Sequence, residues 1–431
     1  MKRIILLLLA LIICTLSFTD LASASAEAPQ VTAAGAALMD GETGELLYDK
    51  NANVKYPPAS TTKIMTALVV LENTNINDKV TVGENPPYVD GSAVGIVTGE
   101  TYTVKDLLIA LMLASGNDCA EALAEHVGGT TEGFVKMMNE RAKELGCKNT
   151  NFVNPSGLYD KNHYTTAKDL ALILRELIKY DSFLEWEKLV YYEMPPTEKD
   201  PNPKWIGNKN ALVLDYADSY YPYAIAGKTG YTVDSKHSYA AAANKDGRIL
   251  ISTMLYGENK SFYFPESKAL LEYGYENFEL IKLYEKNEEV TEVVLNDTTV
   301  PLLASSDVYT IVKADEAEEL FNNKKFVADT ASLGGTNFKA GDEILESSIY
   351  LDEELVATLA LVSGSDYTVP AVKTVKDNVV SFFSSIKGFL LYGAAVILLL
   401  IIILFTIRFI NLRRRRRIFR KRNRRRNKYH F

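Results

Sequence analysis

Residues 388–407 form an uncharged run of 20 residues, and this run limits the possible structures of the chain more than any other feature. A helix rises about 1.5 Å per residue, so a helical run of this length can cross a hydrocarbon layer about 30 Å thick. The segment that follows, residues 408–431, holds 13 Lys and Arg and no Asp or Glu. Because positive charge collects on the cytoplasmic side of membrane helices, we expect one C-terminal transmembrane helix followed by a basic cytoplasmic tail.

The N-terminus has the layout of a secretory signal peptide. Lys2 and Arg3 precede an apolar run from Ile4 to Cys14, and small residues then lead to Ala26. We expect residues 1–26 to be a signal peptide that is cleaved after Ala26, the alternative being a retained N-terminal anchor. Both ends together predict a single-pass protein of the plasma membrane, with its folded part on the extracytoplasmic face and its C-terminus in the cytoplasm.

Charge and cysteine usage exclude several function classes. Residues 1–407 carry 34 basic against 55 acidic residues, so the excess of positive charge is confined to the tail. Membrane topology accounts for that tail better than a nucleic-acid-binding arm does, and we expect no nucleic-acid partner. The three cysteines and four histidines are scattered without the spacing of a metal site, so we expect no metal and no cofactor.

The order of predicted elements indicates an α+β domain over residues 27–279. Two short strands, 35–40 and 46–49, come first, several helices follow, and three strands lie within 224–256. This order predicts one antiparallel sheet, flanked by helices, that gathers both ends of the domain. The predicted helices begin near Ser60, Thr103, Ala120, Glu132, Thr166 and Pro265, whereas residues 181–224 have little periodicity.

A second, β-rich domain is expected over residues 280–370. Short β-type runs at 290–295, 308–313, 325–330 and 356–362 alternate there with turn residues. A polar linker, residues 371–387, would join this small all-β domain to the transmembrane helix.

Ser60 and Lys63 are the first candidate catalytic residues. The predicted helix runs from about Ser60 to Glu72, so the two side chains lie one turn apart on the same face. A serine hydroxyl becomes a strong nucleophile when a neighbouring amine takes its proton. Taken alone, the spacing also fits a serine that only caps a helix.

Ser115 and Asn117 lie at a break between two predicted helices. A hydroxyl and an amide at such a break can both point into a cleft, where Asn117 could bind a substrate amide and Ser115 could relay a proton from Lys63. The alternative interpretation is a plain helix break with a capping residue.

Lys228, Thr229 and Gly230 lie on a predicted strand. Strand alternation places Lys228 and Gly230 on one face, and the missing side chain of Gly230 allows close approach to the backbone. The strand edge could pair with an extended peptide whose terminal carboxylate is bound by Lys228 and the Thr229 hydroxyl.

In this order, Ser-x-x-Lys, Ser-x-Asn and Lys-Thr-Gly resemble the motifs of the low-molecular-mass penicillin-binding proteins, the serine D-Ala-D-Ala carboxypeptidases of the S11 peptidase type. The resemblance covers roughly residues 30–280 and implies a DD-peptidase/β-lactamase-like fold. It rests on the segments Pro57–Lys63, Leu113–Asp118, Asn154–Leu158, His163–Leu170 and Gly227–Gly230.

The resemblance implies a role for each motif residue. Ser60 would be the acylated nucleophile, Lys63 its general base and Ser115 a proton relay, while the backbone N–H groups of Ser60 and Tyr231 would form the oxyanion hole. The implied substrate-binding residues are Asn117, Lys228, Thr229, Gly230 and Tyr231. Tyr231 departs from relatives that have His after Lys-Thr-Gly.

The implied activity is removal of the terminal D-alanine from peptidoglycan stem peptides that end in D-Ala-D-Ala, with β-lactams as covalent inhibitors. The chain has no Glu-x-x-x-Asn element in a position expected for a class A β-lactamase, which favours slow release of penicillin. The alternatives are a β-lactamase or a DD-endopeptidase of the same fold, or a non-catalytic wall-binding protein.

Overall fold

The structure is a computed structural model that describes residues 27–317, 324–331, 333–351, 353–370 and 375–426. The predicted signal peptide and the end of the basic tail lie outside the described residues. The chain divides into two compact units, one of residues 1–293, 301–330 and 341–364, and one of residues 294–300, 331–340 and 365–431. Each unit is described by itself.

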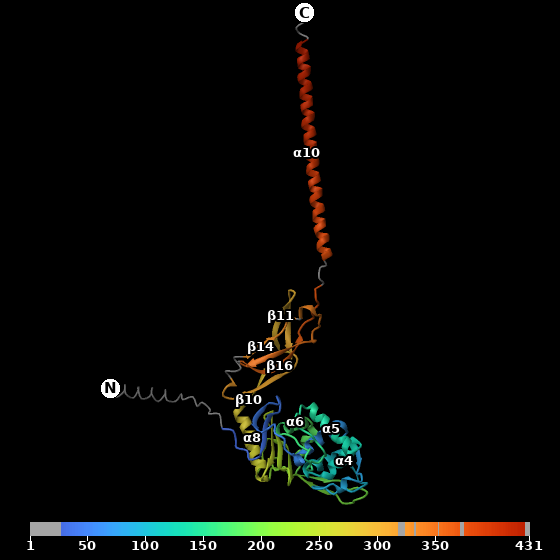
Figure 1. The fold of residues 1–431 in the computed structure, drawn as a ribbon, viewed down its shortest axis with the longest axis vertical. Coiled ribbons are helices and arrows are strands. Elements are labelled where there is room, and N and C mark those ends of the chain that lie inside the picture. Colours follow the sequence, from blue (N-terminus) through green and yellow to red (C-terminus); the bar gives the residue numbers. More distant parts are fainter. Residues whose placement is uncertain (1–26, 318–323, 332, 352, 371–374, 427–431) are drawn as a thin grey trace, which may run out of the picture. The chain divides into compact units, whose positions relative to one another are not determined.

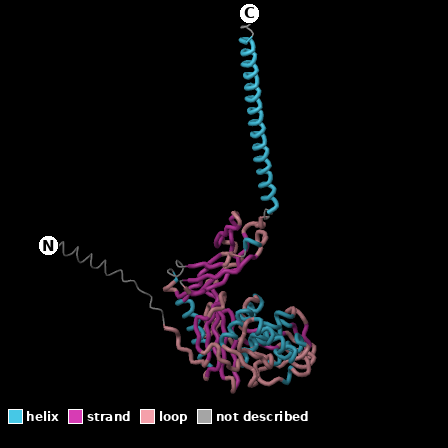
Figure 2. Tube along the Cα trace, turned by 45° about the horizontal axis from the view of Figure 1, so that its top comes forward, coloured by secondary structure: helices cyan, strands magenta, loops and turns pink. Residues whose placement is uncertain are grey.

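A five-stranded antiparallel sheet gathers the two ends of the catalytic domain, as the sequence predicts (Figures 1 and 2). Its order is β2-β1-β9-β8-β7, and β1 pairs with β9 from Gly35 opposite Leu255 to Asp40 opposite Leu250. The strands are β1 (Gly35–Asp40), β2 (Leu46–Lys50), β7 (Ala224–Thr232), β8 (Lys236–Lys245) and β9 (Arg248–Gly257).

Helices cover both faces of this sheet (Figure 1). Successive side chains of β8 point to opposite faces of the sheet. Ala240 and Ala242 pack with the larger group of helices, whereas Ala241 and Ala243 pack with α8 (Tyr263–Asn277). Small side chains on both faces allow the helices to approach closely. The larger group comprises α2 (Lys63–Asn73), α3 (Val104–Leu113), α4 (Asn117–Gly128), α5 (Thr131–Glu144) and α6 (Ala167–Leu177).

Side-chain caps explain why several predicted helix starts are accurate. The Thr103 hydroxyl accepts from the Asp106 N–H at 3.0 Å, and the Asp106 carboxylate accepts from the Thr103 N–H at 2.8 Å, which is a capping box. The Thr166 hydroxyl caps α6 in the same manner by accepting from the Asp169 N–H. The start of α2 differs from the prediction: residues Ala59–Thr62 form a 3₁₀ turn, and the α-helix begins at Lys63.

The aromatic-rich segment 181–224 contains elements that its sequence pattern does not predict. It holds α7 (Asp181–Glu187) and an antiparallel pair, β5 (Tyr191–Met194) and β6 (Lys204–Gly207). Strands of this length give too few residues for an alternation to be read. Four further short elements lie elsewhere in the domain. Strands β3 (Lys79–Thr81) and β4 (Thr101–Thr103) pair with each other, and 3₁₀ turns span Pro86–Tyr88 and Lys260–Phe262.

The segment after α8 is rich in strands, as expected. Strands β12 (Thr298–Ala304), β16 (Glu354–Ser363), β15 (Glu343–Leu351) and β14 (Lys324–Ala328) are antiparallel neighbours in that order. A separate pair joins β10 (Phe278–Tyr284) to β13 (Val308–Lys313), and β11 spans Glu289–Leu295. The sequence does not mark β10, β12 or β15. The boundary between the two domains near residue 279 stays a prediction.

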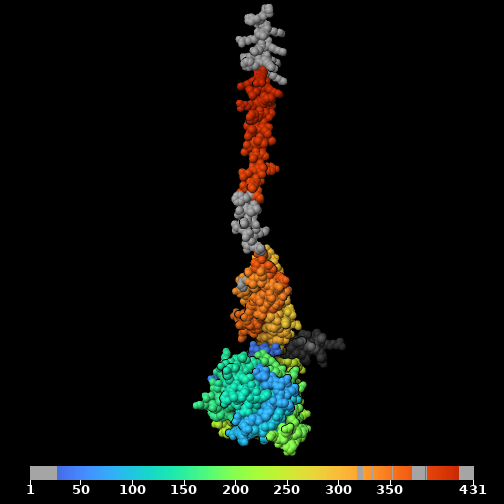
Figure 3. All heavy atoms as spheres, turned by 90° about the vertical axis from the view of Figure 1, so that its right-hand side faces the viewer, coloured from blue at the N-terminus to red at the C-terminus, as the bar shows by residue number. Residues whose placement is uncertain are grey.

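One helix in the described part of the chain, α10 (Val375–Arg426), is long and apolar enough over Ile386–Arg416 to cross a membrane. The run predicted as membrane-spanning, 388–407, lies within it. The large apolar side chains between Ile386 and Leu412 are exposed, and this stretch is drawn in red in Figure 3. Such exposure is costly in water and favourable in lipid, so this helix fits a membrane anchor.

Candidate active site

Ser60 and Lys63 lie side by side where the 3₁₀ turn passes into α2. Lys63 Nζ lies 3.2 Å from Ser60 Oγ, within hydrogen-bonding distance. Ser60 caps neither element, because Pro58 is the cap residue of the 3₁₀ turn and Thr62 is the cap residue of α2. The turn starts at Ala59, whose φ of 50° is left-handed and therefore strained for a residue with a side chain.

Three neutral hydrogen-bond acceptors surround Lys63 Nζ. Besides the Ser60 hydroxyl, Lys63 Nζ donates to Asn117 Oδ1 at 2.6 Å and to the Ser156 carbonyl at 2.6 Å. The side chain is completely buried. Burial lowers the pKa of Lys63 well below its usual range, and the nearby charge of Lys228 lowers it further. The amine is thus suited to accept a proton from Ser60.

The loop between α3 and α4 places Ser115 and Asn117. Ser115 adopts a left-handed backbone conformation with φ of 67° and contributes to the wall of a pocket next to Ser60. Asn117 is buried, and both ends of its amide are occupied, since Nδ2 donates to the Asp90 carbonyl at 2.6 Å and Oδ1 accepts from Lys63. In this geometry Asn117 orients the Lys63 amine.

Strand β7, at the edge of the sheet, brings Gly230 against the Ser60 turn. A Cβ added to Gly230 would lie 2.9 Å from the Ser60 nitrogen and 3.0 Å from the Thr61 nitrogen. Only glycine fits there, because backbone atoms cannot yield as a flexible side chain can. Lys228, on the same face of the strand, is buried, and its Nζ donates to the Thr229 carbonyl at 3.0 Å.

Lys228 has an electrostatic partner that the sequence pattern does not mark. Glu187, at the end of α7, is buried and accepts a hydrogen bond from the Gly227 N–H at 3.0 Å. Burial lowers the pKa of Lys228 to about 7, although the charge of Glu187 opposes that shift. Burial raises the pKa of Glu187 to about 7. The charge of Lys228 therefore depends on a carboxyl group from an aromatic-rich stretch that shows no motif.

A pocket of about 300 Å³ lies over these residues. It is lined by Ser60, Ser92, Ser115, Lys209, Thr229, Gly230, Tyr231, His237, Lys260 and Tyr263. Five of the eight predicted site residues are thus part of its wall, and the other three (Lys63, Asn117 and Lys228) are buried behind it. Sequence reasoning missed Lys209, whose Nζ donates to the Ala114 carbonyl at 2.6 Å. Its charge suits an anionic ligand.

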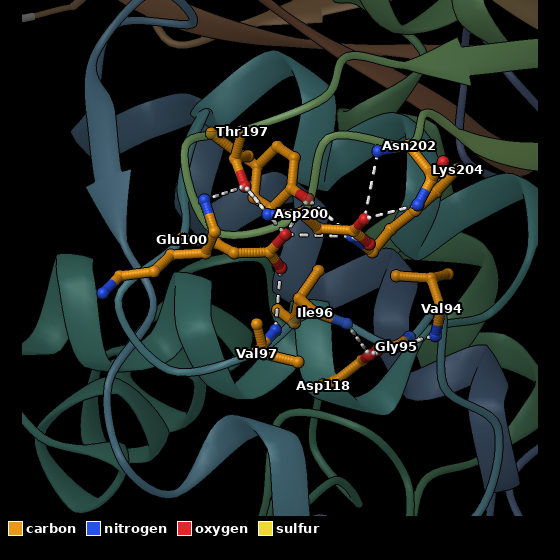
Figure 4. Close-up of polar contacts among 12 residues, drawn as sticks. Val94, Gly95, Ile96, Val97, Glu100, Asp118, Thr197, Asp200, Asn202 and Lys204 are labelled. Atoms are coloured by element: carbon orange, nitrogen blue, oxygen red, sulfur yellow. Dashed lines mark hydrogen bonds and ion pairs between the residues drawn. The ribbon is translucent and has the colours of Figure 1, made fainter.

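One carboxylate fixes the loop that leads into the pocket (Figure 4). The Asp118 carboxylate accepts from the N–H groups of Val94 at 3.0 Å, Gly95 at 2.8 Å and Ile96 at 3.2 Å. The Asn117 N–H donates to the Ser92 carbonyl at 2.6 Å. The helix that carries Asn117 therefore also sets the position of the pocket residue Ser92.

A second polar cluster ties the segment before Lys209 to the same loop (Figure 4). Lys204 Nζ lies 3.0 Å from Glu100 Oε1 and 3.0 Å from Asp200 Oδ2. The Thr197 hydroxyl also donates to Glu100 Oε1 at 3.0 Å, and the Val97 N–H donates to Glu100 Oε2 at 2.7 Å. The Glu100 side chain is fully buried, so its ion pair with Lys204 holds β6 next to the 94–97 loop. Lys209 follows β6 and is held near the same loop.

Among the residues that the structure describes, no group of three or more His, Cys, Asp or Glu could hold a metal ion. Cys119 and Cys147 are buried free thiols. Burial raises the pKa of both thiols, which makes them poor nucleophiles.

Comparison with known proteins gives two family matches. Residues 22–259 match the sequence profile of the peptidase S11 family, described as D-alanyl-D-alanine carboxypeptidase. Residues 278–369 match the C-terminal domain of penicillin-binding protein 5. The chain is 32% identical over 342 residues to the D-alanyl-D-alanine carboxypeptidase DacF of Bacillus subtilis, covering 78% of this chain and 85% of that protein.

Solved structures show the same fold. Penicillin-binding protein 5 from Haemophilus influenzae superposes with a TM-score of 0.67 at 28% identity, over 79% of this chain and 99% of that one. The Streptomyces K15 DD-transpeptidase superposes with a TM-score of 0.54 at 31% identity, over 58% of this chain and 99% of that one. The sequence profile matches more than half of the chain, and the chain belongs to the D-alanyl-D-alanine carboxypeptidase family of S11 serine peptidases.

Proposed function

We propose that this chain is a serine-type D-Ala-D-Ala carboxypeptidase that removes the terminal D-alanine from peptidoglycan stem peptides. The observation that carries the proposal is the buried Lys63 amine, 3.2 Å from the Ser60 hydroxyl and bonded to neutral acceptors. Membership of the family supports the same activity. It does not favour the alternatives, which are a β-lactamase, a DD-endopeptidase and a non-catalytic wall-binding protein.

Acylation is the first half of the proposed reaction. The neutral Lys63 amine accepts the Ser60 proton as Oγ attacks the carbonyl carbon of the penultimate D-alanine. The N–H groups of Ser60 and Tyr231 stabilise the negative charge on the carbonyl oxygen. The Ser115 hydroxyl then passes the proton from Lys63 to the leaving nitrogen. Terminal D-alanine departs, and the shortened peptide stays bound to Ser60 as an ester.

Deacylation is the second half. Water attacks the ester carbonyl and Lys63 accepts its proton. Lys63 then returns this proton to Ser60 Oγ as the acyl–Oγ bond breaks, and the shortened peptide leaves with a new carboxyl group. A β-lactam follows the first half only: its ring opens when Ser60 attacks, but the leaving nitrogen stays tethered to the acyl group. Without the glutamate that activates water in class A β-lactamases, this ester turns over slowly, so β-lactams inhibit the enzyme.

The substrate is proposed to lie along β7 as an added strand. Its terminal carboxylate meets the Thr229 hydroxyl, which lines the pocket, and the positive field of Lys209 and Lys228. Gly230 lets the peptide approach the Ser60 turn, and Tyr231 forms part of the pocket wall. Asn117 contributes by holding Lys63.

The membrane topology is part of the proposal. The exposed apolar surface of α10 over 386–416 supports a C-terminal anchor in the plasma membrane. The basic residues after it favour a single-pass orientation with the C-terminus in the cytoplasm and the catalytic domain on the peptidoglycan side. The proposed domain limits are 27–279 for catalysis, 280–370 for the β-rich domain and 371–387 for the linker.

Two measurements on the full-length protein in detergent test the function. Purified muropeptides with a pentapeptide stem should lose one D-alanine per stem, and fluorescent penicillin should label the protein at one site. Ser60→Ala should abolish both, whereas Ser92→Ala, a matched change in the same pocket, should keep the label. A Ser60→Ala protein that is still labelled would rule out the assignment. Faster hydrolysis of penicillin or of muropeptide cross-links than of the D-Ala-D-Ala bond would favour the alternative enzymes.

A further inference from the structure

Tyr263 links the first turn of α8 to the strand that passes Ser60. Its hydroxyl donates to the Gly230 carbonyl at 2.8 Å. His237, on the neighbouring strand β8, places Nδ1 2.7 Å from the same hydroxyl. Both residues line the pocket that contains Ser60. The carbonyl of Gly230 is thus attached to a chain of two side chains, neither of which belongs to the three sequence motifs.

The number of protons fixes the direction of this chain. A tyrosine hydroxyl has a single proton, and here it is donated to the Gly230 carbonyl. The hydroxyl oxygen must therefore accept from His237, which carries its proton on Nδ1. Hydrogen bonds that follow one another in the same direction polarise and strengthen each other, especially where water is scarce. Tyr263 is buried, and the Tyr231 ring stacks on His237 with 4.4 Å between ring centroids.

The Gly230 carbonyl and the Tyr231 N–H belong to one peptide unit. That unit is planar, and in the trans form its C=O and N–H point in opposite directions. A hydroxyl that holds the carbonyl oxygen therefore also fixes the direction of the N–H, and it makes the N–H a stronger donor. The unit lies directly beside the nucleophile, since a Cβ on Gly230 would be 2.9 Å from the Ser60 nitrogen.

We propose that Tyr263 and His237 are positioning residues for the oxyanion hole: they hold the Gly230–Tyr231 peptide so that the Tyr231 N–H meets the developing oxyanion. This inference rests on the proposed acylation of Ser60. It assigns a role to a tyrosine and a histidine that the motifs do not include. An oxyanion donor acts mainly in the transition state, so the pair should affect kcat and the acylation rate constant more than substrate affinity.

A purely structural role for Tyr263 is the competing explanation. Its ring packs against Phe262, Phe264 and Tyr239, so removing the whole side chain would disturb the core. Tyr263→Phe keeps the ring and removes only the hydroxyl. Tyr275→Phe is the matched control, because Tyr275 lies on the same helix and its hydroxyl donates to the Ala243 carbonyl at 2.9 Å, away from Ser60. Tyr275 is half-buried and Tyr263 is buried, so a general effect of losing a tyrosine hydroxyl should appear in both variants.

The experiment uses the full-length protein in detergent and counts active sites by stoichiometric penicillin labelling. For Tyr263→Phe we expect the acylation rate constant, and kcat for D-alanine release, to fall about tenfold per active site, with KM within a factor of two. Affinity for a boronic acid inhibitor, which forms a tetrahedral adduct with serine, should fall by a similar factor. Tyr275→Phe should keep both rate constants, whatever its effect on the melting temperature.

A double-mutant cycle tests whether His237 acts through Tyr263. His237→Phe keeps a ring for Tyr231 to stack on and removes the donor, so it should slow acylation two- to threefold in the wild type. The same change should have no effect in the Tyr263→Phe protein, because the hydroxyl that it serves is gone.

Three outcomes would overturn the proposal. The Tyr263→Phe protein could be acylated at the wild-type rate, the Tyr275→Phe protein could lose as much of its acylation rate, or Tyr263→Phe could change KM alone. Additive effects of the two substitutions would remove His237 from it. Failure of the proposed function itself would appear separately, as a wild-type protein that penicillin does not acylate at Ser60.

Discussion

Gly230 passes so close to Ser60 that a Cβ on the glycine would lie 2.9 Å from the serine nitrogen. The two residues are far apart in sequence and come from the edge of the sheet and from the turn before α2. Their contact joins the strand expected to bind the substrate to the nucleophile itself. The site thus has little tolerance for movement of either segment.

Gly230→Ala adds a single methyl group but should lower the activity strongly. The new methyl group would meet the Ser60 and Thr61 nitrogens and the Pro58 carbonyl, all of them backbone atoms, at about 3 Å. We expect the Ser60 turn to shift and acylation by penicillin to fall by about 100-fold, in line with the sensitivity of reactions to small misplacements. Gly207→Ala, where a Cβ meets nothing, is the control. An unchanged acylation rate would contradict the observed packing.

The Lys63 amine should set the pH dependence of acylation. Burial lowers the pKa of Lys63. The neutral amine, which accepts the Ser60 proton, is therefore present at a lower pH than for an ordinary lysine. The acylation rate should rise with pH through that pKa and then level off. Lys63→Arg should be inactive at every pH, since a guanidinium stays charged. A Lys63→Arg protein with a normal rate would exclude Lys63 as the base.

Glu187→Gln should weaken substrate binding near neutral pH. Gln can still accept from the Gly227 N–H, but it removes the negative charge that opposes the lowering of the Lys228 pKa. The pKa of Lys228 should then fall below about 7, so that less of its ammonium form is present at pH 7. KM for a D-Ala-D-Ala peptide should rise several-fold at pH 7 and return towards the wild-type value at lower pH. A KM increase independent of pH would point to a structural effect instead.

Asp118→Asn should loosen the loop at 94–97. The carboxylate accepts from three backbone N–H groups of this loop, and an amide, with a single oxygen, replaces these bonds only in part. We expect a loss of about 1–3 kcal/mol in the free energy of unfolding, measured with urea, together with slower acylation. Asp169→Asn is the control, because the Asp169 carboxylate also accepts from a backbone N–H, that of Asn149, at 2.8 Å. The Asp169→Asn protein should be less stable but keep its acylation rate per active site.

Ending the chain at residue 370 should release it from membranes. The truncation removes α10, whose exposed apolar side chains are the basis for the anchor. We expect the shortened protein in the aqueous fraction after cell lysis and the full-length protein in the membrane fraction, with similar D-alanine release from soluble muropeptides. A truncated protein that still sediments with membranes would indicate a second attachment.

The sequence predicts the parts of this molecule that depend on local chemistry. Thr103 and Thr166 cap helices through bonds within their own first turn, so their positions could be read directly. The spacing of Ser60 and Lys63 likewise gave their contact, although the turn between them is 3₁₀ and not α-helical. The five-stranded sheet, which joins strands from the two ends of the predicted 27–279 domain, followed from the order of the elements.

The remaining parts depend on approaches between distant segments. Glu187 reaches Gly227, Lys209 reaches Ala114 and Tyr263 reaches Gly230 only after the chain has folded, and none has a local pattern that marks it. Asn117 shows the same limit in another way. Its presence in the site was predicted, but its hydrogen bonds to Lys63 and the Asp90 carbonyl could not be, because they depend on where two loops meet.

The position of β9 between β1 and β8 has a consequence for a chain exported in the proposed topology. Strand β1 would leave the secretion channel before the other strands but would wait for β9, about 210 residues later, before it gained its inner neighbour. Contacts between such distant residues form slowly, since the intervening segment must first be confined. Newly secreted Ser60 should thus remain unreactive until almost the whole catalytic region has crossed, which would protect the emerging polypeptide from premature capture by antibiotics.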